Sequence, residues 1–162
     1  KKIMAMHTWF ECKIRYEKVM ENGMQKKVTE PYLVDALSFT EAEARIIEEM
    51  TPFISGEFTV SYIKRANYSE LFPSDEESAD RWFKCKLIFI TLDEKSGAEK
   101  KTSTQVLVQA ADLRDAVKKL DEGMKGTMAD YQIGMVSETP LMDVYPYSAE
   151  PNDKPEFDPS KA

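Results

Sequence analysis

Two tryptophans, each accompanied by basic residues, are the side chains of this sequence with the clearest potential for binding chemistry. Trp9 begins the run Trp-Phe-Glu-Cys-Lys, and Trp82 begins the run Trp-Phe-Lys-Cys-Lys. Because side chains alternate between the two faces of a strand, each tryptophan shares a face with the basic residues rather than with Phe and Cys. An aromatic ring beside cations on a sheet can stack on an unpaired base while the cations contact phosphates. The predicted single-stranded nucleic-acid-binding residues are Trp9, Lys13, Arg15, Lys26, Lys27, Trp82, Lys84, Lys86, Lys100 and Lys101.

An alternative interpretation of the same two tryptophans stays open. In this interpretation both rings are buried where two halves of the molecule meet, and the neighbouring lysines extend their charged ends to the rim of that contact. Exposure of Trp9 and Trp82 therefore decides between a binding face and an internal interface.

The sequence shows no pattern typical of catalysis, so we expect a protein that is not an enzyme and needs no cofactor. It has no glycine-rich phosphate loop and no nucleophile elbow. Cys12 and Cys85 fall on the apolar side of their segments, which favours small core residues over metal ligands. His7 is the single histidine, and we expect it at the surface. No metal site is predicted.

Charge and composition narrow the class of protein. The 162 residues are 42% hydrophobic, which is enough for a folded core, and no apolar run is long enough for a membrane-spanning helix. We expect a cytoplasmic protein without a membrane partner. The formal charge of −7 argues against a general nucleic-acid binder. It supports a second hypothesis, a protein–protein interaction module (an adaptor or inhibitor) that acts through a sheet edge or an acidic surface.

An internal repeat organises the chain. Segments recur in the same order about 73 residues apart, beginning with the two tryptophan runs and ending with Leu-Phe-Pro73 and Val-Tyr-Pro146. We predict a first repeat over 8–73, an acidic linker over 74–81, a second repeat over 82–146, and an acidic, proline-containing tail over 147–162.

Each repeat has the pattern strand, strand, helix, strand. The alternating first segment and a second strand are joined by a turn at Gly23 or Gly97. Ser38 or Thr40 caps the first helix, and a second helix spans about 113–124. The last strand is predicted to turn Phe58, Val60 and Tyr62 inward, and Tyr131, Ile133 and Met135 in the second repeat, and to continue, bent, to Phe72 and Tyr145. The fold class is α+β: a tandem duplication of a β-β-α-β unit forming one compact pseudo-twofold domain, with a mainly antiparallel sheet and two helices.

The two ends of the sequence differ in character from the repeats. The sequence begins with Lys1, so we take Met4 or Met6 as the native start. The tail combines three prolines with four acidic residues and Phe157, which predicts a segment that either stays mobile or docks as a peptide.

The run from Met6 to Lys13, its echo at Arg81–Lys86, and the segment Val28-Thr-Glu-Pro-Tyr-Leu-Val-Asp-Ala resemble a known family. It is an uncharacterised domain-of-unknown-function family of Bacteroides-group bacteria and their phages. The resemblance covers about Met6 to Pro146 and implies no catalytic residue set. Occurrence in phages loosely suggests genome handling or host takeover.

Overall fold

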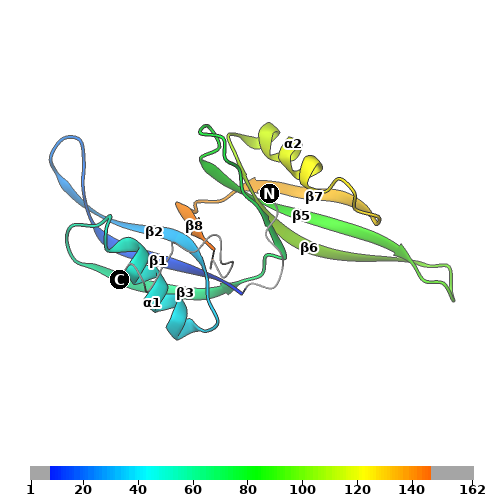
Figure 1. Ribbon diagram of the computed structural model, residues 1–162, viewed down its shortest axis with the longest axis horizontal. Coiled ribbons are helices and arrows are strands. Elements are labelled where there is room, and N and C mark those ends of the chain that lie inside the picture. The colour runs from blue at the N-terminus through cyan, green and yellow to red at the C-terminus, as the bar shows by residue number, and fades with distance from the viewer. Residues whose placement is uncertain (1–7, 147–162) are drawn as a thin grey trace, which may run out of the picture.

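The computed structural model describes residues 8–146, which form two four-stranded sheets and two helices (Figure 1). The first half of the chain contains β1 (Trp9–Val19), β2 (Gln25–Asp35), α1 (Phe39–Met50), β3 (Phe58–Ala66) and β4 (Glu70–Phe72). The second half contains β5 (Arg81–Leu92), β6 (Glu99–Ala110), α2 (Leu113–Gly123), β7 (Asp130–Glu138) and β8 (Asp143–Tyr145). The predicted α+β class and the mainly antiparallel pairing are confirmed.

The two halves exchange their last strands. The sheet orders are β3-β1-β2-β8 and β4-β6-β5-β7, so each sheet is completed by a short parallel strand from the other half. A hydrogen bond from the residue just before each short strand joins it to the other half. The amide of Ser69 donates to the Gln105 carbonyl at 2.8 Å, and the amide of Met142 donates to the Pro31 carbonyl at 2.9 Å. Each sheet therefore depends on both halves of the chain. The sequence predicted one bent last strand per half, whereas the structure has two strands in different sheets.

The long hairpins follow from alternation and turn chemistry. The β1–β2 and β5–β6 turns contain Gly23 at φ +81° and Gly97 at φ +72°, a backbone conformation that side-chain-bearing residues rarely adopt. The predicted turn positions are confirmed. The two hairpins project toward opposite ends of the molecule (Figure 1).

The same capping arrangement begins both helices. The Ser38 hydroxyl accepts from the amide of Glu41 at 3.1 Å, and the Glu41 carboxylate accepts from the amide of Leu37 at 2.8 Å. In α2 the Asp112 carboxylate accepts from the amide of Asp115 at 2.8 Å. Side-chain caps of this kind satisfy amides that lack a partner in the first turn, so they fix where each helix begins.

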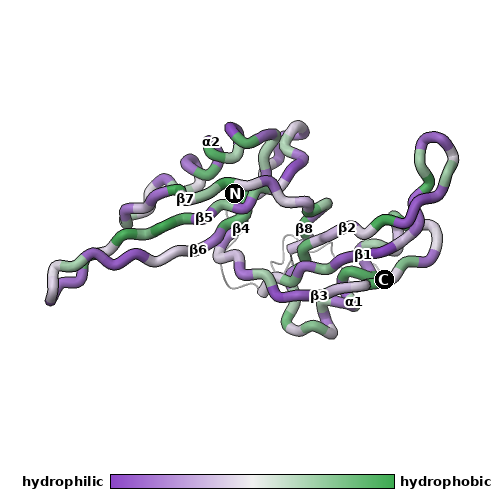
Figure 2. The backbone as a smooth tube through the Cα atoms, turned by 180° about the vertical axis from the view of Figure 1, so that it is seen from behind, coloured by the Kyte–Doolittle hydropathy of each residue, from purple (hydrophilic) through white to green (hydrophobic). Residues whose placement is uncertain are grey.

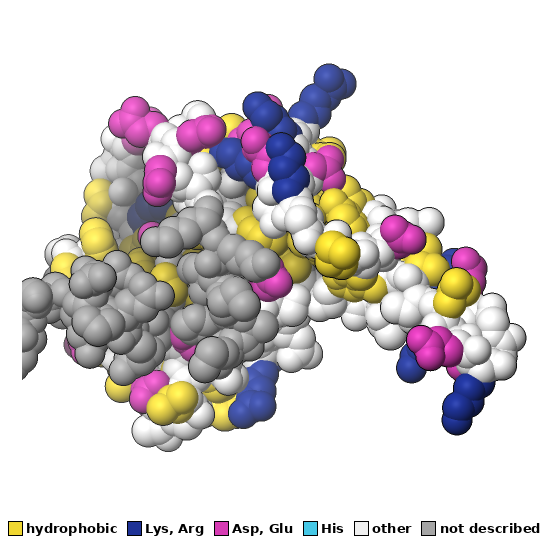
Figure 3. Space-filling model, turned by 45° about the vertical axis from the view of Figure 1, so that its right-hand side comes forward, with side chains coloured by type: hydrophobic (Ala, Val, Ile, Leu, Met, Phe, Trp, Pro, Cys, Tyr) yellow, Lys and Arg dark blue, Asp and Glu magenta, His cyan; other side chains and the backbone are white. Residues whose placement is uncertain are grey.

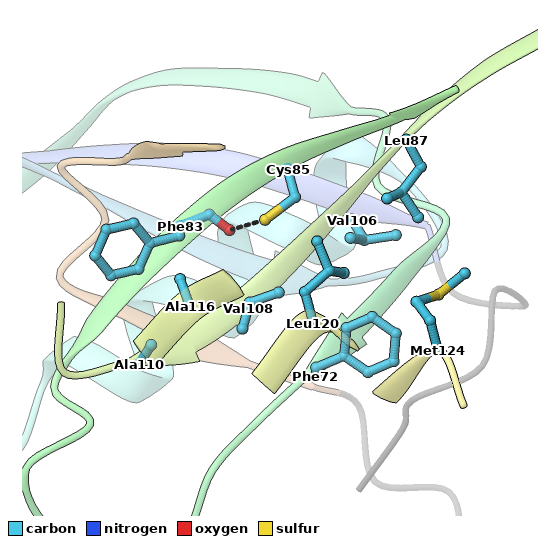
Figure 4. Packing of buried hydrophobic residues seen from close by; sticks show 10 residues of the cluster. All are labelled: Phe72, Phe83, Cys85, Leu87, Val106, Val108, Ala110, Ala116, Leu120 and Met124. Carbon is cyan, nitrogen blue, oxygen red and sulfur yellow. Dashed lines mark hydrogen bonds between the residues drawn. The ribbon is translucent and has the colours of Figure 1, made fainter. Parts of the chain in front are cut away.

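Each helix covers one side of its own sheet with a separate apolar core. The core under α2 joins residues of β4, β5, β6 and α2 (Figure 4): Phe72, Phe83, Cys85, Leu87, Val106, Val108, Ala110, Ala116, Leu120 and Met124. The core under α1 is formed by Phe10, Cys12, Ile14, Val34, Ala36, Ala42, Ile46 and Met50. The sides of the sheets opposite the helices meet in a third cluster, the central cluster, formed by Trp9, Leu33, Leu71, Trp82, Leu107, Leu141 and Val144.

The predicted acidic linker lies against α2. The Lys119 ammonium donates to the Ser74 hydroxyl at 3.0 Å and to the Glu76 carboxylate at 3.1 Å, and it contacts the Asp115 carboxylate at 3.0 Å. Burial opposes the charge of Lys119, but the hydrogen bonds to the two carboxylates outweigh it and raise the pKa of the ammonium. One cation thus ties the connection between the halves to the second helix.

Candidate functional site

The two tryptophans lie inside the protein. Trp9 is 2% exposed and Trp82 is 5% exposed, and both belong to the central cluster with residues from the two halves. The Thr139 amide and hydroxyl both donate to the Trp82 carbonyl, at 2.8 Å and 2.9 Å. Burial removes both rings from the stacking surface that the sequence predicted. The alternative, burial where the halves meet, is the arrangement that the structure has.

The surfaces that remain for a ligand are the parts of each sheet that face away from its helix, beyond the central cluster; we call them the open faces. The first open face carries Glu11, Lys13, Arg15 and Glu17 of β1, Lys27 and Thr29 of β2, and Tyr62 and Lys64 of β3. The second open face carries Lys84, Lys86, Ile88, Ile90 and Leu92 of β5, Glu99, Lys101, Ser103 and Gln105 of β6, and Asp130, Gln132, Met135 and Ser137 of β7. Six of the predicted basic residues therefore lie on open faces: Lys13, Arg15, Lys27, Lys84, Lys86 and Lys101.

The first open face holds an exposed aromatic ring among cations. Tyr62 is 39% exposed, and the Lys13 ammonium lies 4.5 Å from the centre of its ring. Lys64 lies two residues along β3, and Arg15 lies two residues along β1. A β-bulge at Ser61 places Tyr62 here, because Lys13 pairs with Tyr62 while Ile14 pairs with Val60.

In both halves a β-bulge reverses which side chains of the last strand face the core, so the predicted orientation is wrong beyond the bulge. The row Phe58, Val60, Tyr62 was expected inward, but beyond the bulge Ile63 packs against the core. In the second half Lys86 pairs with Met135 and Leu87 pairs with Ile133, so Gly134 is the extra residue. There Val136 packs against the core and Met135 is 41% exposed. Tyr62 and Lys64 were missed for this reason.

The second open face carries an aliphatic row on β5 where the first carries Arg15 and Glu17 on β1. Ile88 and Ile90 are half-buried, yet they belong to none of the three hydrophobic clusters of residues 8–146. Leu92 at 68% exposure continues the row toward the hairpin turn. Figure 2 shows the hydrophobic colour continuing along β5 toward the turn beside a mostly hydrophilic β6. Lys84 and Lys86 lie at the inner end of this row.

The ten predicted residues do not form one continuous track. Lys26 pairs with Lys18 and Lys100 pairs with Thr91, so both point to the helix side of their sheets. The lysines of the two hairpins also lie toward opposite ends of the molecule (Figure 1).

A cavity of about 560 Å³ opens where the β1–β2 hairpin extends past the start of β3. Its charged lining is Arg15, Glu17, Lys27 and Glu57. Two cations and two carboxylates give the cavity no net preference for an anion or a cation, and the polar Ser55 and Thr59 complete one wall.

The two cysteine thiols pack in the apolar cores, and two tyrosine hydroxyls share one carboxylate. Burial raises the pKa of the Cys12 thiol to about 12 and that of Cys85 to about 11, so both stay protonated at neutral pH. The Tyr16 hydroxyl donates to the Glu30 carboxylate at 2.8 Å, and the Tyr32 hydroxyl donates to the same oxygen at 3.3 Å. Within residues 8–146 no group of three or more histidine, cysteine or acidic side chains is placed to hold a metal ion. No helix in this part of the chain is long and apolar enough to cross a membrane.

A family model described as "Domain of unknown function (DUF4494)" matches residues 8–147, the same stretch that carries both sheets and both helices. The chain belongs to this family. The match confirms the predicted resemblance to an uncharacterised domain family, and the DUF4494 boundaries enclose both open faces. A search among curated proteins found no match, and a search among solved structures also found none.

Proposed function

We propose that this protein is a non-catalytic binding protein of the cytoplasm that holds single-stranded nucleic acid on the first open face. We further propose that the chain is a tandem duplication with pseudo-twofold symmetry. We also propose that its family occurs in Bacteroides-group bacteria and their phages. The observation that carries the binding proposal is the exposed Tyr62 ring beside Lys13 on the side of the sheet opposite to α1.

Charge on this face supports the proposal. The residues assigned to this face include four cations, Lys13, Arg15, Lys27 and Lys64, and two acidic residues, Glu11 and Glu17. A locally positive face on a chain with a formal charge of −7 concentrates attraction for phosphates at one place.

The aromatic ring favours a single strand over a duplex. A ring on a sheet stacks on a base only when that base is not already stacked in a helix, and such a contact contributes about 1–3 kcal/mol per base. Strand neighbours lie about 4.8 Å apart, so Tyr62 and the Lys13 ammonium reach one nucleotide together. Lys13 then contacts the phosphate while Tyr62 stacks on the base.

The test is fluorescence anisotropy of a labelled single-stranded oligonucleotide at low salt. Tyr62→Ala should weaken binding about 5- to 150-fold, which corresponds to about 1–3 kcal/mol. Met135→Ala is the matched control, because Met135 has the same place beside the bulge of the other sheet. Lys13→Gln should reduce the slope of log affinity against log salt by about 1. Lys86→Gln then measures what the second open face adds.

Equal affinities for wild type and Tyr62→Ala would contradict the proposal, as would an affinity that does not change with salt. The second candidate, a protein–protein interaction module, is favoured by a different observation: the apolar row Ile88, Ile90 and Leu92 on the second open face. Binding of a protein through that row should change little with salt, which separates the two candidates.

A further inference from the structure

The second open face is an apolar surface without a cover among the described residues. Ile88 and Ile90 stand in one row with Leu92, and Met135 lies on β7 opposite Lys86, at the inner end of this row. The Cδ1 atom of Ile88 lies 2.9 Å from where a Cβ on Gly134 would be, so the glycine lets this isoleucine lie over the bulge. Figure 3 shows hydrophobic side chains along the projecting arm, with charged ones toward its tip.

The size of the surface argues for a peptide rather than a second copy of the chain. Three strands about 4.8 Å apart and about six residues at 3.3 Å each give a footprint of roughly 300 Å². A stable dimer buries about 800 Å² on each partner, so this face alone is too small for one. An extended segment that is already tethered needs far less area, because its effective concentration is in the millimolar range.

Charge around the row defines what such a segment must carry. Lys84 and Lys86 flank the row at its inner end, whereas at its outer end Ile90 lies between Lys101 of β6 and Asp130 of β7, and Leu92 pairs with Glu99. A ligand with one large apolar side chain between carboxylates is complementary to this arrangement. Residues 147–162, which lie outside the described residues, contain that combination: Glu150, Asp153, Glu156, Phe157 and Asp158.

The described residues end close enough to the second open face for the 147–162 segment to reach it. Val144, two residues before Pro146, packs in the central cluster with Leu107, and Leu107 pairs with Lys84. From there Ile90 is six residues along β5, about 20 Å away. Phe157 follows Pro146 by 11 residues, which span up to about 36 Å when extended.

We propose that the 147–162 segment packs Phe157 onto Ile88 and Ile90 of the second open face, with its carboxylates beside Lys84 and Lys86 at the inner end of the row. The segment covers the apolar row and occupies the lysines at the same time. This inference does not rest on nucleic-acid binding, which is assigned to the other sheet.

The experiment is methyl NMR of the full chain with labelled isoleucine δ1 groups. Ring-current shifts and cross-peaks should connect the Phe157 ring to the methyls of Ile88 and Ile90. Phe157→Ala should abolish both signals and return these methyls to less shifted positions, while the exposed Ile47 on α1 serves as the unaffected control. Replacing the four acidic residues of the segment by their amides should make the shifts smaller, and added salt should do the same to wild type.

Two results would overturn the proposal. If Phe157→Ala leaves the Ile88 and Ile90 methyls unmoved, the segment is not the occupant. If these methyls shift with protein concentration instead, and sedimentation shows a dimer that Ile90→Lys abolishes, a second copy covers the face. Neither result affects the oligonucleotide measurement with Tyr62→Ala, so the two proposals fail separately.

Discussion

The two open faces occupy the same position in their sheets but carry different chemistry. Counted from the bulge, Arg15 and Glu17 of β1 correspond to Ile88 and Ile90 of β5. The residues next to the bulge differ in the same direction: Ser61, Tyr62 and Lys64 on β3 correspond to Gly134, Met135 and Ser137 on β7. Beyond the bulge the first face continues with charged residues beside an aromatic ring, whereas the second continues with an aliphatic row that has charged residues at its ends.

The inner ends of the same strands show no such difference. Trp9 and Trp82, Leu33 and Leu107, and Leu71 and Val144 occupy matching places in the central cluster. Residues that must hold the two sheets together are alike, whereas residues beyond that contact differ. Packing therefore constrains the centre of the molecule, and the outer parts of the sheets are free to differ in sequence.

The helix sides of the sheets differ as well, and the difference is again polar against apolar. In the first sheet Tyr16 donates to Glu30, and the ring of Tyr145 stacks on Tyr32 with centroids 6.2 Å apart. At the matching places the second sheet has Phe89, Thr104, Phe72 and Val106. The first core holds a small hydrogen-bonded cluster where the second packs rings against α2.

The largest expected effect tests the shared centre. Trp9→Ala and Trp82→Ala should each lower the free energy of unfolding by about 3–5 kcal/mol, because each removes a ring that both halves surround. Urea unfolding followed by circular dichroism gives these values. Tyr62→Ala, on the surface, should change stability by no more than about 0.5 kcal/mol.

The same variants test whether the strand exchange makes one cooperative unit. Each retains a single tryptophan, which reports on the half opposite to the substitution. The fluorescence and circular dichroism transitions should coincide, because β8 completes the sheet of the first half and β4 completes the sheet of the second half. Two separate transitions would show that the halves unfold independently, and the account of the centre given above would be wrong.

A smaller effect tests the difference between the helix sides. A Cβ on Gly123 would lie 2.8 Å from the buried Phe72 ring, so Gly123→Ala should overpack this core. Overpacking costs about 1–3 kcal/mol, which exceeds the gain in helix propensity of up to about 1 kcal/mol. The matching residue of α1 is Glu49, beside Tyr145, and Glu49→Ala should cost less than about 0.5 kcal/mol.

Thermal or urea unfolding of both variants checks this comparison, and a double variant locates its cause. Phe72→Leu in the Gly123→Ala background should recover part of the lost stability, because the smaller side chain makes room for the new methyl group. If Gly123→Ala stabilises the protein instead, the contact with Phe72 is not the constraint at this position.

The local sequence pattern predicted the individual strands, turns and helices. It did not determine which strands pair or where the bulges lie, because these depend on residues far apart in the chain. Alternation and the turns at Gly23 and Gly97 were visible in the sequence because each depends on neighbouring residues, and of the two predicted caps, Ser38 and Thr40, the structure has Ser38. The exchange of β4 and β8 was not visible, because it depends on pairing between residues that are far apart in the chain. The bulges at Ser61 and Gly134 were missed because one extra residue reverses every later side chain without changing the composition of the strand.

The smallest expected effect is on the pH dependence of stability, and it distinguishes Tyr16 of the first sheet from Phe89, which takes the matching place in the second. Burial and the hydrogen bond to Glu30 raise the pKa of Tyr16 to about 12 from the ordinary 10.0. A folded-state pKa above the unfolded value means that the folded protein keeps the proton longer, so stability is complete below pH 10 and is lost as the pH rises toward 12. The urea midpoint should therefore fall between pH 9 and pH 11, and it should fall less in Tyr16→Phe, as a phenylalanine such as Phe89 cannot titrate. Val60→Ala, in the same core, should lower the midpoint equally at both pH values; an equal fall in wild type and Tyr16→Phe would place the alkaline sensitivity elsewhere.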